Sequence, residues 1–382
     1  GDWFVVNRAD PRAWGCGRVG AGTVVPFGPD AGESVGAFLV GDRLVWRFAG
    51  QEHEICRRGE LPLPGDHVAA NALAAIAAAC LRGAGPEHAR EGLLRARPVP
   101  HRLELVATVK GVDFINDTAA TAPAAVRAAL ATYRHRPVIL IAGGADKGVD
   151  LRPLAQEIAT AVRVVVLLAG TATPALHDAL REAGAVVYGP CGSMEEAVNL
   201  AAGLAQPGDV VLLSPGCASF GLFRDEFHRG EAFREAVCRL AARAATEEYA
   251  RLQQHELAGL RLGLLHGRMR AEEKEAVMAA FRDGAIDVLV ATAVVEVGVD
   301  VPNATLMLIE GAERFGLAQL HQFRGRVGRG EHPATCVLIS QATTPEALER
   351  LQTVVESHDG LALAEADLRL RGPGDYYGLR QS

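Results

Sequence analysis

The chain alternates twice between short apolar runs and longer stretches of helical periodicity, and this feature constrains its fold most. In the first alternation the apolar runs are Phe114–Ile115, Val138–Ala142, Val164–Ala169, Val186–Tyr188 and Val210–Ser214. The helical stretches between them are Ala122–Thr132, Leu151–Ala161, Thr173–Ala183 and Met194–Leu204. Apolar strands that alternate with helices through short loops indicate a parallel sheet covered on both faces. The predicted fold class is therefore α/β.

A second alternation begins at Leu262–Leu265. Its further strands are predicted at Asp287–Ala291, Leu306–Ile309 and Cys336–Ile339, and its helices at Ala271–Asp283, Leu317–Arg324 and Pro345–Ser357. Between the two alternations, Glu231–Leu252 predicts one long helix, with a domain boundary near Ala244–Glu248. We therefore expect two parallel-sheet α/β domains, at residues 98–240 and 246–370, and a short final segment at 371–382.

Residues 1–97 follow a different pattern and are expected to form a third, partial unit. Strands broken by Gly and Pro are predicted here, and Arg43–Phe48 is expected to pair with Gln51–Cys56 in a hairpin. The earlier strands are predicted at Trp3–Asn7, Thr23–Phe27 and Gly36–Val40. A helix through Val68–Arg82 is apolar nearly all round, which predicts that it is buried, and Gly83, Gly85 and Pro86 are expected to stop it.

The composition limits the classes of function. Of the 382 residues 49% are hydrophobic, but the apolar runs are too short to cross a bilayer, so no membrane partner is expected. The net charge is -7, and residues 246–382 hold 14 Lys and Arg against 20 Asp and Glu, so autonomous DNA binding is expected to be weak. The seven Cys lack CxxC spacing and are expected to be reduced packing residues. The absence of a leader pattern and of an initiator Met predicts a cytoplasmic, partial chain.

Two groups of polar residues in the first half follow a strand or lie in a helix, where α/β proteins place ligands. Asn71 lies in the apolar helix, and its amide can bond either a base edge or a neighbouring loop. Arg102 offers a fork suited to phosphate, and Asp117 can accept ribose hydroxyls. Arg102 can equally pair with Glu104 or Asp117 in a surface salt bridge.

Two loops of small residues follow strong strands, at 143–148 and 213–220. Both can present backbone N–H groups to a carboxylate or phosphate, and the first adds the ammonium group of Lys147.

In chain order these segments read GDHVAAN, PHRLE, NDTAAT, GGADKG, LSPGCAS and FHRGEAF, and together they resemble the Mur ligase family, most closely the UDP-N-acetylmuramoyl-L-alanine:D-glutamate ligases of peptidoglycan synthesis. The resemblance covers about residues 1–240 and implies a partial central domain followed by a Rossmann-like domain. It implies ATP with Mg2+ as cofactor, and D-glutamate and UDP-muramoyl-alanine as substrates. The implied ATP contacts are Asn71, Arg102 and Asp117. The implied D-glutamate contacts are Thr121, Lys147, Ser219 and Phe220, with Lys147 also catalytic.

The first half departs from the Mur ligase pattern in three respects. Val68 stands where the family usually has Asn, and Ala119 where some members have Lys, which places more weight on Lys147. No GxxxxGK[ST] phosphate loop occurs in the 382 residues, so half of the holder for Mg-ATP is missing. We therefore expect no independent ligase activity.

The second half contains Gln322, Arg326 and Arg329 at helical spacing. One helix face is predicted to present two guanidinium groups that stabilise transferring phosphate charge. The alternative is a solvated basic helix start, which the neighbouring loop Glu296–Asp300 disfavours.

The segments LLHGRM, ATAVVEVGVDVP, ERFGLAQLHQ and QFRGRVGR resemble the second RecA-like domain of superfamily 2 helicases, and in particular the RecG type. The tail DLRLRGPGDYYGLRQS resembles the start of the RecG translocation motif. The resemblance implies that Glu296, Gly298 and Asp300 couple nucleotide to branched DNA, while Arg326 and Arg329 reach ATP held by a first motor domain. The Walker A segment of such a first domain is absent from these residues.

The chain is thus expected to join the C-terminal portions of two ATP-using enzymes, both inactive alone. Two alternatives are a non-catalytic scaffold that binds nucleotide or D-glutamate, and an artificial join of two truncated reading frames.

Overall fold

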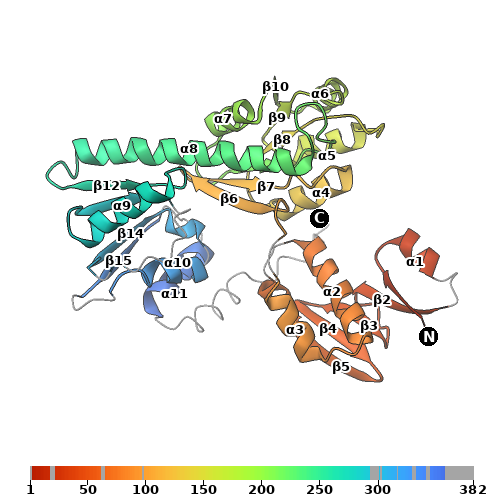
Figure 1. Ribbon diagram of the computed structural model, residues 1–382. Coiled ribbons are helices and arrows are strands. Elements are labelled where there is room, and N and C mark those ends of the chain that lie inside the picture. The colour runs from red at the N-terminus through yellow and green to blue at the C-terminus, as the bar shows by residue number, and fades with distance from the viewer. Residues whose placement is uncertain are drawn as a thin grey trace. The chain divides into compact units, whose positions relative to one another are not determined.

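The computed structural model describes residues 2–17, 22–61, 65–96, 99–292, 301, 303–315, 317–328, 333–340 and 345–357. The chain divides into two compact units that meet in sequence at residues 98 and 99. Within the described ranges, the first unit contains one sheet, and the second contains a six-stranded sheet and two two-stranded sheets (Figure 1). The two sequence alternations therefore form separate sheets.

The sheet of the first unit has the order β1-β2-β3-β4-β5. Its strands are β1 (Trp3–Asn7), β2 (Thr23–Pro29), β3 (Gly36–Val40), β4 (Arg43–Phe48) and β5 (Gln51–Arg57). The pairs β1/β2 and β2/β3 are parallel, whereas β3/β4 and β4/β5 are antiparallel. Ala49 and Gly50 both have positive φ in the β4–β5 turn, as a two-residue type I′ hairpin requires. The predicted hairpin is confirmed.

The helices of the first unit are α1 (Pro11–Gly17), α2 (Asp66–Leu81) and α3 (Pro86–Leu94), with a short 3₁₀ turn η1 (Arg58–Glu60). The prediction that α2 is buried is confirmed on one face only. One face, which includes Leu73 and Ile76, packs in the core, but Asn71 and Ala75 are exposed. Alanine is the best helix former and is small enough to be exposed at little cost. The sequence of an alanine-rich helix therefore does not indicate which of its faces are buried.

The main sheet of the second unit has the order β10-β9-β8-β11-β7-β6. Its strands are β6 (Glu104–Val109), β7 (Val112–Asn116), β8 (Val138–Ala142), β9 (Val164–Leu168), β10 (Val187–Cys191) and β11 (Val210–Leu213). Five strands are parallel and lie at the predicted runs. The edge strand β6 was not among the predicted strands, and it pairs antiparallel with β7.

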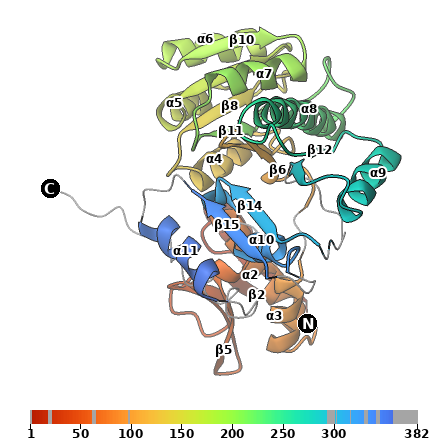
Figure 2. The same cartoon turned by 90° about the vertical axis from the view of Figure 1, so that its left-hand side faces the viewer.

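Helices cover both faces of this sheet, because consecutive strand residues point to opposite sides (Figure 2). On β8, Val138 and Leu140 join one core cluster, while Ile139 and Ile141 join the other. The first cluster includes residues of α4 (Pro123–Thr132), α5 (Arg152–Ala161) and α6 (Thr173–Glu182). The second includes residues of α7 (Met194–Leu204) and α8 (Glu226–Gln254). The predicted α/β layering is confirmed.

The second alternation forms two parallel strand pairs, β12 (Leu262–Leu265) with β13 (Val288–Ala291), and β14 (Leu306–Glu310) with β15 (Thr335–Ile339). The accompanying helices are α9 (Ala271–Arg282), α10 (Leu317–Arg324) and α11 (Pro345–Glu356), with a 3₁₀ turn η2 (Ala312–Arg314). Helix α8 runs without interruption through the predicted boundary at 244–248 and then packs against β12 and β13. Among the described residues, no helix is both long and apolar enough to span a membrane.

Candidate anion site

A small hollow lies at the C-terminal ends of β7, β8 and β11, where parallel sheets place their ligands. Its lining includes Thr121, Lys147, Gly216 and Cys217, which come from the three loops that follow these strands. The space available to water is about 40 Å³. One water needs roughly 10–15 Å³ on this measure, so the hollow suits a group about the size of a carboxylate.

Three helices begin at this hollow. Ala122, Leu151 and Ala172 are the N-cap residues of α4, α5 and α6, and all three line it. None of these cap residues makes a side-chain hydrogen bond to its helix, but each helix has Pro at its first or second position. Arg152 N donates to Asp150 Oδ1 at 3.0 Å and Thr173 N to Gly170 O at 3.1 Å, so these termini offer a ligand the helix dipole rather than free N–H groups. Because the N-terminus of a helix carries a partial positive charge, three of them together favour an anion.

Lys147 adds a full positive charge to the lining, and its neighbour Asp146 adds a carboxylate. Its side chain is exposed, and its Nζ donates to the backbone oxygen of Thr121 at 3.0 Å. The resemblance to Mur ligases implied that these two residues act at one site, and both line this hollow. The Lys147 loop is held to the loop after β11 by two backbone hydrogen bonds between Ala145 and Ala218, at 2.8 and 3.1 Å. Gly144 permits this approach, because a Cβ there would overlap Ala218 O.

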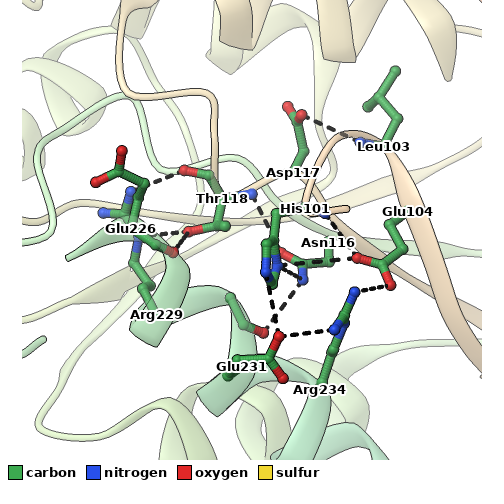
Figure 3. A network of polar contacts seen from close by, with 11 residues as sticks. His101, Leu103, Glu104, Asn116, Asp117, Thr118, Glu226, Arg229, Glu231 and Arg234 are labelled. Atoms are coloured by element: carbon green, nitrogen blue, oxygen red, sulfur yellow. Dashed lines mark hydrogen bonds and ion pairs between the residues drawn. The ribbon is translucent and has the colours of Figure 1, made fainter. Parts of the chain in front are cut away.

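Arg229, from the first turn of α8, bonds to Cys217 of the lining and to Thr118, and Figure 3 shows its side chain beside Thr118. It is fully buried, and its Nε donates to Thr118 Oγ1 at 2.9 Å. Its Nη1 donates to Cys217 O at 3.2 Å and its Nη2 to Thr118 O at 3.0 Å. Burial lowers the pKa of Arg229 to about 10, so the guanidinium group remains charged at neutral pH.

His101 connects the segment before β6 to α8, and Figure 3 shows its ring among polar groups from both. Its Nδ1 lies 2.9 Å from Asn116 Nδ2, and its Nε2 lies 3.3 Å from Glu231 Oε1. Glu104 accepts from the His101 backbone N–H at 2.9 Å and also pairs with Arg234. This network fixes the end of β7 against the start of α8.

Asp117 and Arg102, the residues proposed for ATP, lie on neighbouring loops. Asp117 is only 7% exposed and accepts hydrogen bonds from Ser214 Oγ at 2.9 Å and from Leu103 N at 3.3 Å. Burial raises the pKa of Asp117 to about 6, against the opposing effects of these hydrogen bonds and of the Arg102 charge. Arg102 is exposed, and the alternative of a salt bridge with Glu104 or Asp117 is wrong among the described residues, since Glu104 pairs with Arg234 instead.

The other predicted residues of the first half are dispersed. Ser219 is buried and Phe220 is 65% exposed, and neither lines the hollow. Asn71 belongs to the first unit, and its exposed position removes the argument that a buried amide needs a partner.

In the second half, the prediction that Gln322 and Arg326 share a helix face is wrong. Helix α10 ends at Arg324, and the chain then turns through hydrogen bonds from Arg326 N to Phe323 O and from Val327 N to Arg324 O. These bonds join residues three apart, so Arg326 leaves the helical register. Gln322 is exposed and Arg326 is half-buried. The predicted residues Glu296, Gly298, Asp300 and Arg329 lie outside the described residues.

Two family models match separate parts of the chain. Residues 101–217 match the Mur ligase, glutamate ligase domain, and residues 233–331 match the helicase conserved C-terminal domain. The chain joins a Mur ligase domain to a helicase domain. The six-stranded sheet with its helices is called the ligase-like module below, and β12 to α11 the helicase-like module.

Relatives of known name match each module. The UDP-N-acetylmuramoylalanine--D-glutamate ligase of Roseiflexus sp. (strain RS-1) is 54% identical over 204 residues, which cover 53% of this chain and 44% of that protein. The ligase of the same name from Symbiobacterium thermophilum is 41% identical over 241 residues, covering 62% and 52%. The ATP-dependent DNA helicase RecG of Synechocystis sp. is 51% identical over 144 residues, covering 38% and 17%. The chain thus spans about half the length of these ligases and about a sixth of that helicase.

The main residues that sequence reasoning missed in the ligase-like module are Arg229 and Thr118. Both lie within quoted motifs, FHRGEAF and NDTAAT, but nothing in either motif indicates that the arginine is buried. The available signal was Gly230, because glycine in a helix interior is unfavourable unless another group approaches closely.

Proposed function

We propose that the ligase-like module binds D-glutamate through one of its carboxylates in the hollow at the ends of β7, β8 and β11. The observation that carries the proposal is the convergence of three helix N-termini and Lys147 on a single hollow. The volume of about 40 Å³ suits one carboxylate, so the remainder of the amino acid extends outward. Both ligase relatives bear D-glutamate in their names, which supports this choice of acid.

ATP and Mg2+ are proposed as cofactors of the same module. Arg102 suits a phosphate, because it is exposed and no described residue pairs with its guanidinium group. Asp117 suits ribose less well, since the protein already supplies two donors and leaves 7% of the residue exposed. When bound, ATP with Mg2+ supplies the phosphoryl group that activates a carboxylate for amide formation. The contact of Asn71 with adenine, and the roles of Thr121, Ser219 and Phe220 toward D-glutamate, remain proposals at the same level.

For the helicase-like module we propose a contact with branched DNA that is weak when the chain acts alone. The named relatives are DNA helicases, but residues 246–382 carry more acidic than basic side chains. The role of Arg326 and Arg329 as groups that contact ATP on another motor domain belongs to this proposal.

The D-glutamate proposal is tested by isothermal titration of the full chain with D-glutamate. Lys147→Gln should weaken binding by on the order of tenfold, because one charge of the site is lost. Lys110→Gln is the matched control, since Lys110 lies on the β6–β7 turn and pairs with Glu247 at the surface. Absence of binding by the unmodified chain, or equal weakening by both substitutions, would sink the proposal.

A further inference from the structure

Arg229 is the largest fully buried side chain of the described residues, and its charge lacks a close counter-ion there. Its three acceptors among the described residues, Thr118 Oγ1, Thr118 O and Cys217 O, are all neutral. Within the described part of the chain, no carboxylate lies within ion-pair distance of its guanidinium group. Glu226 acts on it only through a weaker, longer-range attraction.

The neighbouring thiol does not supply the missing negative charge. Burial raises the pKa of Cys217 to about 11, so this side chain is neutral at physiological pH. A buried ion without a counter-charge is costly and is retained where something compensates for it. Cys217, whose carbonyl oxygen accepts from Arg229, lines the hollow, so one residue separates the buried charge from an anion bound there.

Arg229 also holds two loops of the hollow in place. The hydroxyl of Thr118 donates to Glu226 O at 3.0 Å, so its lone pairs are free to accept from Arg229 Nε. Thr118 precedes Thr121 in the loop after β7, and Cys217 lies in the loop after β11. One guanidinium group thus binds the backbone of both loops and fixes their separation.

We propose that Arg229 is a positioning residue of the anion site and that its buried charge makes the site select an acidic amino acid over its neutral amide. The inference rests on the proposed binding of D-glutamate and extends it to specificity. A purely structural arginine would hold the loops but would leave the ratio of the two affinities unchanged when its charge is removed.

The test compares the binding of D-glutamate and D-glutamine to the full chain by calorimetry. Arg229→Gln retains hydrogen-bond donors but removes the charge, whereas Arg229→Lys retains the charge. Arg243→Gln is the control, because Arg243 lies on the same helix, is exposed and donates to Asn199 at 2.6 Å. We expect the unmodified chain, Arg229→Lys and Arg243→Gln to bind D-glutamate more tightly than D-glutamine. In Arg229→Gln the ratio of these two affinities should fall by on the order of tenfold.

A second measurement, by NMR, uses the unmodified chain and so does not depend on whether a variant folds. The Nε–H resonance of Arg229, assigned through its own side-chain carbons by NMR, should shift when D-glutamate is added and shift less with D-glutamine. An unmoved resonance despite D-glutamate binding, or an affinity ratio that Arg229→Gln leaves intact, would overturn the positioning role. Failure of the unmodified chain to bind either amino acid would instead refute the proposed function.

Discussion

Gly230 occupies a position in α8 where a single methyl group cannot be accommodated. A Cβ there would overlap the His101 ring and lie 2.7 Å from Thr118 Cγ2. Both neighbours are buried and hydrogen-bonded, so neither can move aside at low cost. We expect Gly230→Ala to lower the free energy of unfolding by roughly 1–3 kcal/mol, as measured by urea denaturation.

The control for Gly230→Ala is Gly203→Ala in α7. No atom lies within 4 Å of a Cβ built at Gly203, so alanine should stabilise the helix by up to about 0.5–1 kcal/mol. Equal effects of the two substitutions would show that contact with His101 is not what requires glycine at position 230.

Asp117 should make the stability of the ligase-like module depend on pH. Its pKa is about 6 in the folded chain, against an ordinary value of 3.8, because burial disfavours the ionised form. Its stabilising contribution is therefore fully present below pH 3.8 and is lost as the pH rises through 6, by about 3 kcal/mol in total. Urea denaturation should show the unmodified chain losing stability relative to Asp117→Asn across this range. Parallel pH profiles of the two proteins would contradict the assignment.

At the scale of single residues, sequence reasoning succeeded where a motif fixed a residue by its place in a loop. Lys147 and Thr121 meet at one hollow because both follow parallel strands, whose ends share one edge of the sheet. It failed where the role of a residue depends on its burial. Asn71 was expected in a buried helix but is exposed, and the buried Arg229 was not recognised. Burial depends on which residues from distant segments surround a side chain, and local sequence does not contain that information.

Among the elements, the central strands were predictable because they are buried on both faces and read as continuous apolar runs. The edge strand β6 has only Val109 buried and a bulge between Leu105 and Ala107, so its pattern is weak. Helix α3 was missed for a related reason, since only Ala89 of it is buried. Pro86, which was expected to end the preceding helix, is the first residue of α3, a position that proline favours.

Helix α8 is one continuous helix that contacts both modules. Phe233 and Val237 pack in the core of the ligase-like module, whereas Tyr249 Oη donates to Leu262 O of β12 at 3.3 Å. Ala245→Pro should break the helix between these contacts at a cost of about 3 kcal/mol. We expect faster amide hydrogen exchange in β12, with exchange in β8 unchanged. Ala245→Ser is the control, and unaltered protection of β12 in the proline variant would show that the helicase-like module folds independently of α8.

At the scale of the whole molecule, the join lies inside this helix rather than in a flexible linker. The helicase family model begins to match at residue 233, within the part of α8 that packs on the ligase-like sheet. The domain limits 98–240 and 246–370 therefore remain predictions, because one continuous helix contributes to both modules. Each module therefore keeps its own sheet while sharing one helix.

The last prediction is that the 382-residue chain hydrolyses no ATP in response to branched DNA and does not unwind it. Hydrolysis in this class of motor needs a cleft in which one RecA-like domain holds Mg-ATP on a Walker A loop and the other inserts arginines. No GxxxxGK[ST] segment occurs in these residues, and the GGADKG loop lacks the Ser or Thr that would bind Mg2+. Arg326, half-buried in the turn after α10, is the arginine proposed for the inserting side.

Addition of a separately made first motor domain from a RecG relative should restore part of the activity, because an arginine acting from another chain is worth roughly 10³–10⁵ in rate. Phosphate release with and without branched DNA measures the effect. Arg326→Ala should abolish the restored activity, while Arg282→Ala, which removes an exposed arginine from the end of α9, should leave it unchanged. DNA-stimulated phosphate release by the chain alone, lost in Arg326→Ala, would show that these residues already contain a complete motor.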